Sequence, residues 1–417
     1  MAETAVAASG SGGRPAKFER RKEEILRAAG ALVNRHGLRD TTLALVASEI
    51  GLNLKSLRYY FEKREDLVSA AFLHAIRLHR ELVEQALTIA DFPTRIRHVV
   101  VSYFDLLARV RRGEEPQFVY FGDIRGLTEP HINEVGAAYV DMFRLARRLF
   151  HSDALQLAPE EESACAHMLL SQLYWSVMWT TTHAVEDLPR AAERFTDILL
   201  HGIAARPVEV AGDYSVVSTP FSPSDQLSQQ SFLQAATHLI NEYGYRGASV
   251  DRISATLNVT KGAFYHYNDT RDELVIACFE RTFDIIRQAQ NDAMAKDGDG
   301  LSHIGEAAAA LVARQMLPEG SLLRTAALTA LGMDHRMEMN RRLSMSTWRF
   351  ADMLNDGLID GSVRACDMRI AAETVTAMIN SAQELQRWVP KSDVRNAPHL
   401  YVRPLLNGFL RIGRSPA

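Results

Sequence analysis

Two stretches of the sequence align with each other without a gap: NRHGLRDTTLALVASEIGLNLKSLRYYFEKREDLVSAAF, residues 34–72, and NEYGYRGASVDRISATLNVTKGAFYHYNDTRDELVIACF, residues 241–279. The offset places Gly37 on Gly244, and the same register continues upstream and downstream. Shared helical amphipathicity does not by itself make a turn glycine, an arginine and a tyrosine coincide. We therefore interpret the two stretches as an internal repeat.

The first repeat has the pattern of short helices joined by a tight turn. Residues 25–33 place apolar side chains at the i, i+3, i+4, i+7 and i+8 spacing of one helical face, and Gly37 is expected to end this helix. Thr42 is suited to cap a short second helix, after which Gly51 permits the positive φ of a tight turn. A third helix is expected at residues 54–60. Two such helices form a helix-turn-helix, whose second helix has the width to enter a major groove.

The third helix carries hydrogen-bond donors on the side that faces away from the core. Leu57 and Phe61 are expected to face inward. The donors suit both phosphate oxygens and base edges. They are Lys55, Ser56, Arg58, Tyr59 and Tyr60.

These segments resemble the DNA-binding domain of the TetR family. Its signature has a glycine, a Thr-Thr/Ser cap and a tail similar to V-S-K-G-T-L-Y-H-H-F-x-x-K-x-x-L. The second repeat follows this tail closely from Val259 to Leu274 and departs mainly at Asn268, where an aromatic residue is usual. The first repeat keeps Phe61 but has leucine, lysine and arginine at positions 54, 55 and 58, where lysine, glycine and tyrosine are usual.

The resemblance and the donor pattern together give the predicted DNA-binding residues. The resemblance implies phosphate contacts by Thr42, Asn53, Tyr59, Tyr60 and Arg64 in the first unit and by Ser249, Thr260, His266, Tyr267 and Arg271 in the second. The candidate base readers are Lys55, Ser56, Lys261 and Ala263. Arg58, Gly262 and Tyr265 complete the two reading helices.

Charge is unequal between the two units, although the whole chain has a formal charge of −4. Residues 14–80 hold fourteen Lys and Arg against eight Asp and Glu, a balance of +6, whereas residues 228–290 hold six against seven, a balance of −1. Because neutralised phosphates supply most non-specific affinity, the first unit is expected to bind DNA more strongly by itself. Its basic arm RPAKFERRK, which includes Arg14 and Lys17, is suited to a minor groove.

After each repeat comes a longer region rich in Ala, Leu and Met that predicts several helices and almost no strand. The resemblance implies that these bodies bind ligands and mediate dimerisation, and that a ligand changes the spacing of the reading heads. Met and aromatic residues at helical spacing are candidates for lining an apolar pocket, and the alternative is that they form ordinary core or a dimer seam. The candidates are Tyr174, Trp175 and Trp179 in the first body and Met333, His335, Met337 and Trp348 in the second.

The predicted fold class is all-α, with two helix-turn-helix DNA-binding domains that are each followed by a helical ligand-binding and dimerisation bundle. At 417 residues, more than one core is expected. A stretch with three prolines and many small polar residues separates the halves. The predicted boundaries are a disordered tail 1–13, a first helix-turn-helix domain 14–84, a first helical domain 85–204, a linker 205–226, a second helix-turn-helix domain 227–290 and a second helical domain 291–417.

The predicted function is that of a sequence-specific DNA-binding transcriptional regulator, a repressor relieved by a small apolar ligand. Since TetR-like proteins act as dimers, the tandem suggests that the two bodies pair within one chain and present unlike heads to an operator with unlike half-sites. Alternatively, two chains pair as a homodimer and carry four heads. In a further alternative, only the first head binds DNA and the second is structural. Activation in place of repression stays open, because the direction of regulation depends on where the operator lies relative to the promoter.

Other classes of protein lack support in the sequence. No P-loop, GxSxG or dinucleotide glycine fingerprint occurs, so neither an enzyme nor a cofactor is expected. Cys165, Cys278 and Cys366 have no CxxC spacing and the histidines no HExxH spacing, which argues against a disulfide framework or a metal site. Two further classes are disfavoured. A non-specific architectural DNA binder would need broad basic faces, and a sensor that acts through a protein partner would need two heads that no longer bind DNA. Neither a signal peptide nor a membrane span is expected, which predicts a cytoplasmic protein.

Overall fold

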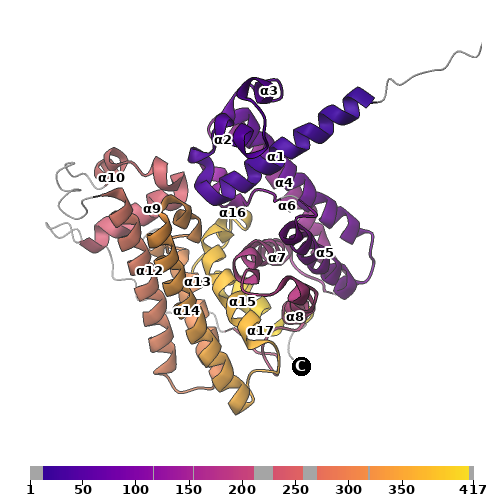
Figure 1. The fold of residues 1–417 in the computed structure, drawn as a ribbon. Coiled ribbons are helices and arrows are strands. Elements are labelled where there is room, and N and C mark those ends of the chain that lie inside the picture. The colour runs from indigo at the N-terminus through magenta and orange to yellow at the C-terminus, as the bar shows by residue number, and fades with distance from the viewer. Residues whose placement is uncertain are drawn as a thin grey trace, which may run out of the picture.

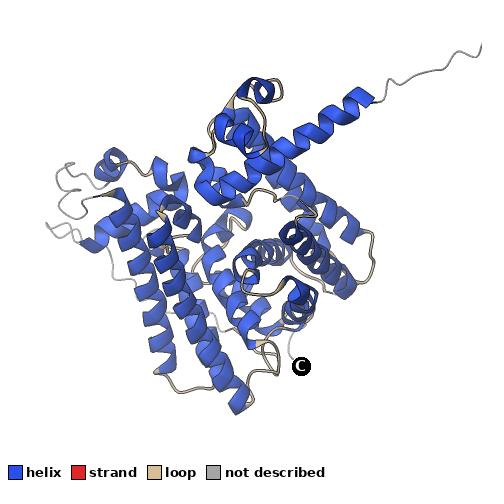
Figure 2. Cartoon of the chain, viewed as in Figure 1, coloured by secondary structure: helices blue, strands red, loops and turns tan. Residues whose placement is uncertain are grey.

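The computed structural model describes residues 13–115, 117–153, 155–210, 229–256, 270–317 and 320–412. Within these ranges the regular secondary structure is helical, and the extended backbone pairing is an isolated bridge between Ala204 and Val363 (Figure 2). The predicted all-α fold is therefore confirmed. Among these residues no helix is both long and apolar enough to cross a membrane.

The first half consists of three helices at its N-terminal end and a larger helical body beneath them (Figure 1). Gly37 has a φ of 79° and interrupts α1 before its last residues, at the position where the sequence predicts a helix end. The elements of this half are α1 Gly13–Asp40, α2 Leu43–Glu49, α3 Leu54–Arg58, α4 Arg64–Leu87, α5 Phe92–Arg112, η1 Phe121–Gly126, α6 His131–Arg147, η2 Arg148–Phe150, α7 Pro159–Thr180, η3 Val185–Asp187 and α8 Leu188–His201.

The second half repeats this order. Gly244, the counterpart of Gly37, has a φ of 70° and kinks α9 in the same way. α12 and α4 both have 24 residues and begin at equivalent arginines, so the repeat extends beyond the aligned motif. The elements are α9 Gln229–Gly247, α10 Val250–Thr256, α12 Arg271–Met294, α13 Gly300–Gln315, η5 Thr325–Ala330, α14 Met333–Asp360, α15 Met368–Ser381, η6 Ala382–Glu384, α16 Leu385–Trp388 and α17 Ala397–Asn407.

The last helices of the two halves pack on one another. α7 and α8 contact α15 and α17, and one continuous cluster of buried apolar side chains draws on both bodies. Gln172 donates a hydrogen bond through Nε2 to the carbonyl oxygen of Thr374 at 2.8 Å, and Trp175 donates through Nε1 to the carboxylate of Glu373 at 2.9 Å. The two helical bodies are thus paired within a single chain.

Two glycines let the backbones of the halves touch at the ends of α8 and α17. Gly202 has a φ of 70° and Gly408 a φ of 77°, and each directly follows its helix. A Cβ on Gly202 would lie 2.2 Å from the carbonyl oxygen of Leu406. The amide of Ile203 donates to that same oxygen at 2.9 Å. Only glycine permits both this backbone conformation and this approach.

The first residues of the expected linker pack against the second body. The amide of Ala205 donates to the carbonyl oxygen of Ser362 at 2.9 Å. Val208 exchanges two hydrogen bonds with the side chain of Asn407, at 2.9 and 2.8 Å. Residues 211–226 of the expected linker lie outside the described ranges. Residues 205–210 therefore help to join the halves.

Candidate nucleic-acid interface

Two polar side chains cap the helices of the first helix-turn-helix. The Thr42 hydroxyl accepts a hydrogen bond from the amide of Leu45 at 3.1 Å, and Asn53 Oδ1 accepts from the amide of Ser56 at 2.8 Å. Each oxygen satisfies an amide that the helix leaves without an intrahelical partner. Between them Gly51 turns the chain with a φ of 64°. The predicted helix-turn-helix is confirmed here, with α3 ending at Arg58 and the next two residues in a turn.

One face of this unit presents donors to solvent. Lys55, Arg58 and Tyr59 are exposed on α3 and just after it, and the Tyr59 ring is 77 % exposed. Leu57 and Phe61 point the other way and are buried, as the sequence predicts. The caps Thr42 and Asn53 are exposed beside the donors, and Ser56 is half-buried. Cationic, phenolic and hydroxyl groups therefore share one exposed surface, and such groups suit phosphate oxygens and base edges.

The basic arm of the sequence forms part of α1, which begins at Gly13 and projects past the rest of the unit (Figure 1). Residues 14–22 therefore form helix and not an extended peptide arm. Phe18, which sequence reasoning missed, stacks on Tyr60 with ring centroids 4.8 Å apart and meets Tyr59 edge-on at 5.9 Å. Lys17 is exposed, and only the backbone of Arg14 is described. The projecting turns of α1 thus support the aromatic end of α3.

Arg64 starts α4 behind the exposed face. Its guanidinium donates to the carboxylate of Glu65 at 2.8 and 3.0 Å and to the carbonyl oxygen of Leu38 at 3.4 Å. Glu65 has its pKa lowered by backbone and side-chain hydrogen bonds, the latter from Arg64. The guanidinium of Arg64 is therefore already paired with Glu65, and the predicted phosphate contact would have to form in addition to that ion pair or replace it.

The second helix-turn-helix is described only in part. Ser249 takes the place of Thr42 and accepts a hydrogen bond from the amide of Arg252 at 3.2 Å, which caps α10. Arg271 begins α12, and only its backbone is described. Seven predicted contacts lie outside the described residues: Thr260, Lys261, Gly262, Ala263, Tyr265, His266 and Tyr267. They stay predictions.

Equivalent asparagines attach the two heads to their bodies. Asn34 donates through Nδ2 to the carbonyl oxygen of Phe118 at 2.7 Å and accepts through Oδ1 from the amide of Tyr120 at 2.8 Å. Asn241 forms the same two bonds with residues 322–324, at 2.8 and 3.1 Å. The alignment of Asn34 on Asn241 was the sequence signal for this attachment.

A cleft of about 620 Å³ lies between the two heads. Its walls come from the end of α1 and η1 on one side and from α9 and η5 on the other. Each head also contacts the 3-10 helix of the opposite half, since α1 packs on η5 and α9 packs on η1. Each of the two 3-10 helices therefore contacts both heads. The arginines of the cleft are Arg64, Arg125, Arg252 and Arg324.

The candidate ligand residues lie in two kinds of surroundings. Trp175 and Trp179 are buried in the first body, and Tyr174 packs on His79 with ring centroids 5.4 Å apart. The four candidates of α14 are exposed instead: Met333, His335, Met337 and Trp348. The structure does not bring the two groups together.

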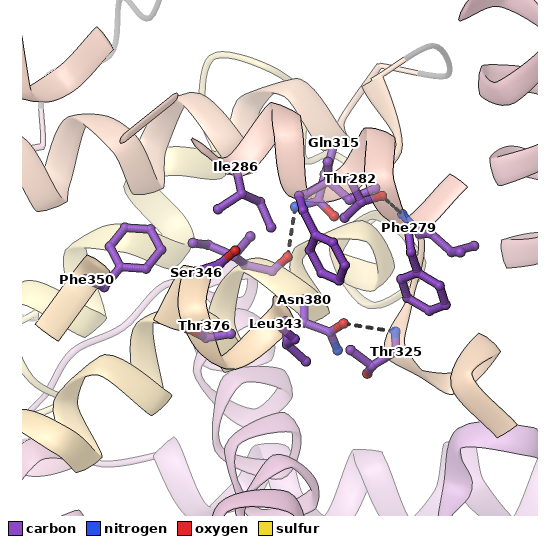
Figure 3. Close-up of a pocket in the computed structure, with 14 residues that line it drawn as sticks. Phe279, Thr282, Ile286, Gln315, Thr325, Leu343, Ser346, Phe350, Thr376 and Asn380 are labelled. Carbon is purple, nitrogen blue, oxygen red and sulfur yellow. Dashed lines mark hydrogen bonds between the residues drawn. The ribbon is translucent and has the colours of Figure 1, made fainter. Parts of the chain in front are cut away.

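A pocket in the second body is lined by residues that sequence reasoning did not single out (Figure 3). It lies between α12, α13, α14, α15 and η5. No short motif marks these residues, because they meet only when five separate elements pack. Among the described residues, no group of three or more His, Cys, Asp or Glu is placed to hold a metal ion. The lining residues are Phe279, Thr282, Phe283, Ile286, Gln315, Leu322, Leu323, Thr325, Leu343, Ser346, Phe350, Thr376, Ile379 and Asn380.

Comparison with known proteins agrees with both helix-turn-helix units. The profile described as "Bacterial regulatory proteins, tetR family" matches residues 25–71 and again residues 232–278. The chain belongs to the TetR family. It carries the family's N-terminal domain twice, in tandem.

This TetR-family chain is similar to three proteins over part of its length. The Transposon Tn10 TetC protein of Escherichia coli is 42 % identical over 52 residues, which are 12 % of this chain and 26 % of that protein. The HTH-type transcriptional regulator BetI of Yersinia pestis is 28 % identical over 88 residues, 20 % of this chain and 44 % of BetI. The matches thus span less than half of these curated relatives. The solved structure of the TetR family transcriptional regulator PfmR from Thermus thermophilus is 19 % identical with a TM-score of 0.36, over 42 % of this chain and 97 % of PfmR.

Proposed function

We propose that this protein is a sequence-specific DNA-binding regulator of transcription that carries two unlike reading heads in one chain. The observation that carries the proposal is the exposed face of the first head, where Lys55, Arg58 and Tyr59 stand clear of a buried Leu57. The family match to both heads supports the same function for the second. Phosphate contacts position such a unit, and side chains that reach base edges give it specificity.

Pairing of the bodies inside one chain supports the two-headed arrangement. α7 and α8 of one body and α15 and α17 of the other form the contact that a second chain would otherwise provide. Both heads lie along the upper edge of Figure 1, α2 and α3 at the top and α10 to the left. A single chain then presents two helix-turn-helix units to one stretch of duplex, in the way that a symmetric dimer does.

The operator is expected to have unlike half-sites. Identical heads related by a two-fold axis read a palindrome. Here the reading segments differ, LKSLRYY in residues 54–60 against KGAFYHY in residues 261–267. Lys55 of the first head, for example, falls on Gly262 of the second, so the two heads carry different donors to the bases.

Charge supports an alternative in which the first head alone holds DNA. The first unit has a balance of +6 and the second a balance of −1, and phosphate affinity follows local positive charge. In that case the second unit contributes packing: its buried cluster around Phe232, Phe279 and Leu328 joins helices of the head to η5.

The pocket of the second body supports control by a small molecule. It is lined mostly by apolar side chains with a few polar groups, which is the usual character of a ligand site. A ligand that binds one spacing of the heads better than another shifts the protein towards that spacing. We propose repression relieved by such a ligand.

Selection of bound sequences from a random DNA pool by the full chain tests the proposed function. An asymmetric site occupied by one chain, with the chain number determined by light scattering, supports two heads in one protein. A palindrome occupied by two chains favours the alternative of a single active head. Absence of any enriched sequence overturns the proposal.

A further inference from the structure

The exposed hydrophobic side chains of this protein gather on one helix. Ten large hydrophobic side chains are exposed among the described residues, and six of them lie on α14. Single exposed residues of this kind are usual on a protein surface, whereas a cluster of them indicates a surface that binds another molecule. The six are Met333, Met337, Met345, Trp348, Leu358 and Ile359.

The corresponding helix of the first body has a polar outer side. α6 and α14 each follow the 3-10 helix of their own half, η1 and η5. α14 continues for 28 residues, whereas α6 has 17. The exposed positions of α6 are Asn133, Glu134, Ala137, Asp141, Arg144 and Arg147. The hydrophobic outer side is therefore particular to the second body, and the repeat by itself does not require it.

Six exposed positions of α14 form a straight line along the helix, which we call the α14 seam. They follow one another in alternate steps of four and three residues, the spacing with which two helices pack side by side. The opposite side of the helix is buried and includes Met339, Phe350 and Leu354. The seam consists of Arg341, Met345, Trp348, Asp352, Asn355 and Ile359.

The α14 seam lies apart from the contact that joins the two bodies. That contact is made by α7 and α8 with α15 and α17, and α14 packs on α12, α13 and α15 through its buried side. Within the seam, the guanidinium of Arg341 donates to Met345 Sδ at 3.3 Å and to the carboxylate of Glu338 at 2.8 Å. The Glu338 pair is exposed, so it contributes little to stability and can rearrange. Asp352 forms no ion pair with any residue that the structure describes.

A second copy of the chain fits the seam when the two α14 helices run antiparallel. A two-fold axis midway between positions 345 and 348 places Met345 against Trp348 of the second copy and Arg341 against Asp352 of the second copy, and each contact occurs twice. A thioether against an aromatic ring and opposite charges against each other are both favourable. Parallel helices would instead place Arg341 against Arg341 and Asp352 against Asp352, and like charges that meet in this way are unfavourable. The charges of the seam therefore select the antiparallel arrangement.

The direction of α14 decides where the heads of such a pair lie. α14 runs from the side of the heads to the far end of the second body (Figure 1). It begins directly after η5, which packs on α1 and α9 of the two heads. It ends at Asp360, whose carboxylate accepts a hydrogen bond from the amide of Gly300 at 2.8 Å. Because antiparallel pairing reverses α14, the heads of the two copies lie at opposite ends of the pair.

We propose that two copies of this chain pair through the α14 seam in an antiparallel orientation, and that the pair holds two separate DNA duplexes at its opposite ends. Each operator is then occupied by one chain, and the pair connects two operators. The pairing itself does not depend on DNA and is measurable without it. The second part of the proposal rests on the DNA-binding function proposed above.

Sedimentation velocity of the full chain over a series of concentrations tests the pairing. We expect a reversible change from particles of one chain to particles of two chains. Trp348→Ala removes the largest side chain of the seam and is expected to raise the Kd of the pair at least tenfold. Because Trp348 is exposed in the single chain, the thermal midpoint of the variant, measured at a concentration where the wild type is a single chain, should stay unchanged.

Charge exchange tests the antiparallel orientation. Arg341→Asp and Asp352→Arg each bring like charges together in the pair, and each is expected to raise its Kd at least tenfold. The double variant restores opposite charges and should return the Kd to within threefold of the wild-type value. Arg144→Asp in α6 is the matched control, since Arg144 is also exposed and pairs with an acidic residue three positions earlier. It should leave the Kd within twofold.

Capture of a second duplex tests the position of the heads. One duplex of the selected sequence is immobilised and a second, identical duplex carries a fluorescent label. The wild-type chain is expected to bind the immobilised duplex and to capture the labelled one. Arg341→Asp should bind the immobilised duplex with unchanged affinity and capture none of the labelled one.

Several outcomes would overturn the proposal. They are a chain that stays single at the highest concentration, a pair that tolerates all of these variants, and a double variant that pairs no better than the single ones. A pair that binds the immobilised duplex but captures no labelled duplex overturns the opposed position of the heads. A chain that pairs as expected but binds no duplex contradicts the proposed function and the link between operators, while the sedimentation result still supports the pairing.

Discussion

The carboxylate of Glu384 in the second body accepts a hydrogen bond from Arg125 in the first body at 3.0 Å. Arg324 shares the same oxygen at 2.6 Å, and all three side chains are no more than 20 % exposed. Arg125 also donates to the carbonyl oxygen of Asn241 within α9, the first helix of the second head. One carboxylate thus neutralises two guanidinium groups where both halves and a head meet.

Glu384→Gln is expected to destabilise the protein by about 3 kcal/mol. The variant keeps the size of the side chain but leaves two largely buried arginines without their counter-charge, and breaking one partner of a buried pair typically costs about 3–5 kcal/mol. Urea unfolding followed by circular dichroism measures the change. Glu338→Gln, which removes an exposed partner of Arg341, is the control and should leave the midpoint unchanged. Equal effects of the two variants would contradict the importance of the buried cluster.

Acidification is expected to destabilise the fold before most carboxylates titrate. Burial lowers the pKa of His79 to about 4, and burial does the same for His167. Between pH 6.5 and 4 the two histidines therefore bind protons in the unfolded chain but stay neutral in the folded chain. The free energy of unfolding consequently falls as the pH falls. Each histidine contributes a slope of roughly 1.4 kcal/mol per pH unit within that range.

His79→Leu should reduce this slope by about one histidine's share. Tyr103→Phe is the matched control, since it alters the same aromatic cluster without removing a group that titrates below pH 7. The measurement is the unfolding free energy at several pH values from 7 to 4. A slope that His79→Leu leaves unchanged would show that His79 is not held neutral in the folded protein.

The caps and turns of the first head were predictable because they depend on residues that are near in sequence. Thr42 and Gly51 act within three or four residues of their positions, so composition and spacing specify their roles. The repeat likewise predicted that Asn34 and Asn241 are equivalent. Local rules of this kind give the helix-turn-helix and its exposed face, but they do not give what packs against it.

The pocket and the support of α3 required the three-dimensional structure. Phe18 reaches Tyr60 across 42 residues of chain, and Thr325 meets Asn380 across 55. Helical periodicity shows which residues of α14 share a face, but it does not show which face a neighbour covers. Trp348 is 61 % exposed, whereas Phe350, two residues later, is buried in the pocket wall.

Gly202→Ala is expected to disrupt the joint between the halves. Its Cβ would meet the carbonyl oxygen of Leu406 at 2.2 Å, and its backbone has a positive φ that alanine disfavours. Gly113→Ala is a matched control, because Gly113 has a φ of 75° with nothing within 4 Å of its Cβ position. We expect Gly113→Ala to cost about 1–2 kcal/mol from backbone strain alone, and Gly202→Ala to cost several kcal/mol more. Thermal midpoints of the two variants measure the difference, and similar midpoints would mean that the close approach is not required.

Lys55→Ala and Arg58→Ala should weaken operator binding in different ways. Lys55 is a candidate base reader, so its loss is expected to reduce affinity by about 1–3 kcal/mol and to relax sequence preference in one half-site only. If Arg58 contacts a phosphate, its loss is instead expected to weaken binding to all sequences. The slope of log Kd against log salt should then fall by about one. Arg341→Ala removes the same charge from the exposed surface of α14 and is the control for net charge. Affinities measured at several salt concentrations with half-site variants distinguish these effects. If the sequence preference relaxes in both half-sites, the first head reads each of them. In that case two chains bind the operator together, and only the first head of each chain is active.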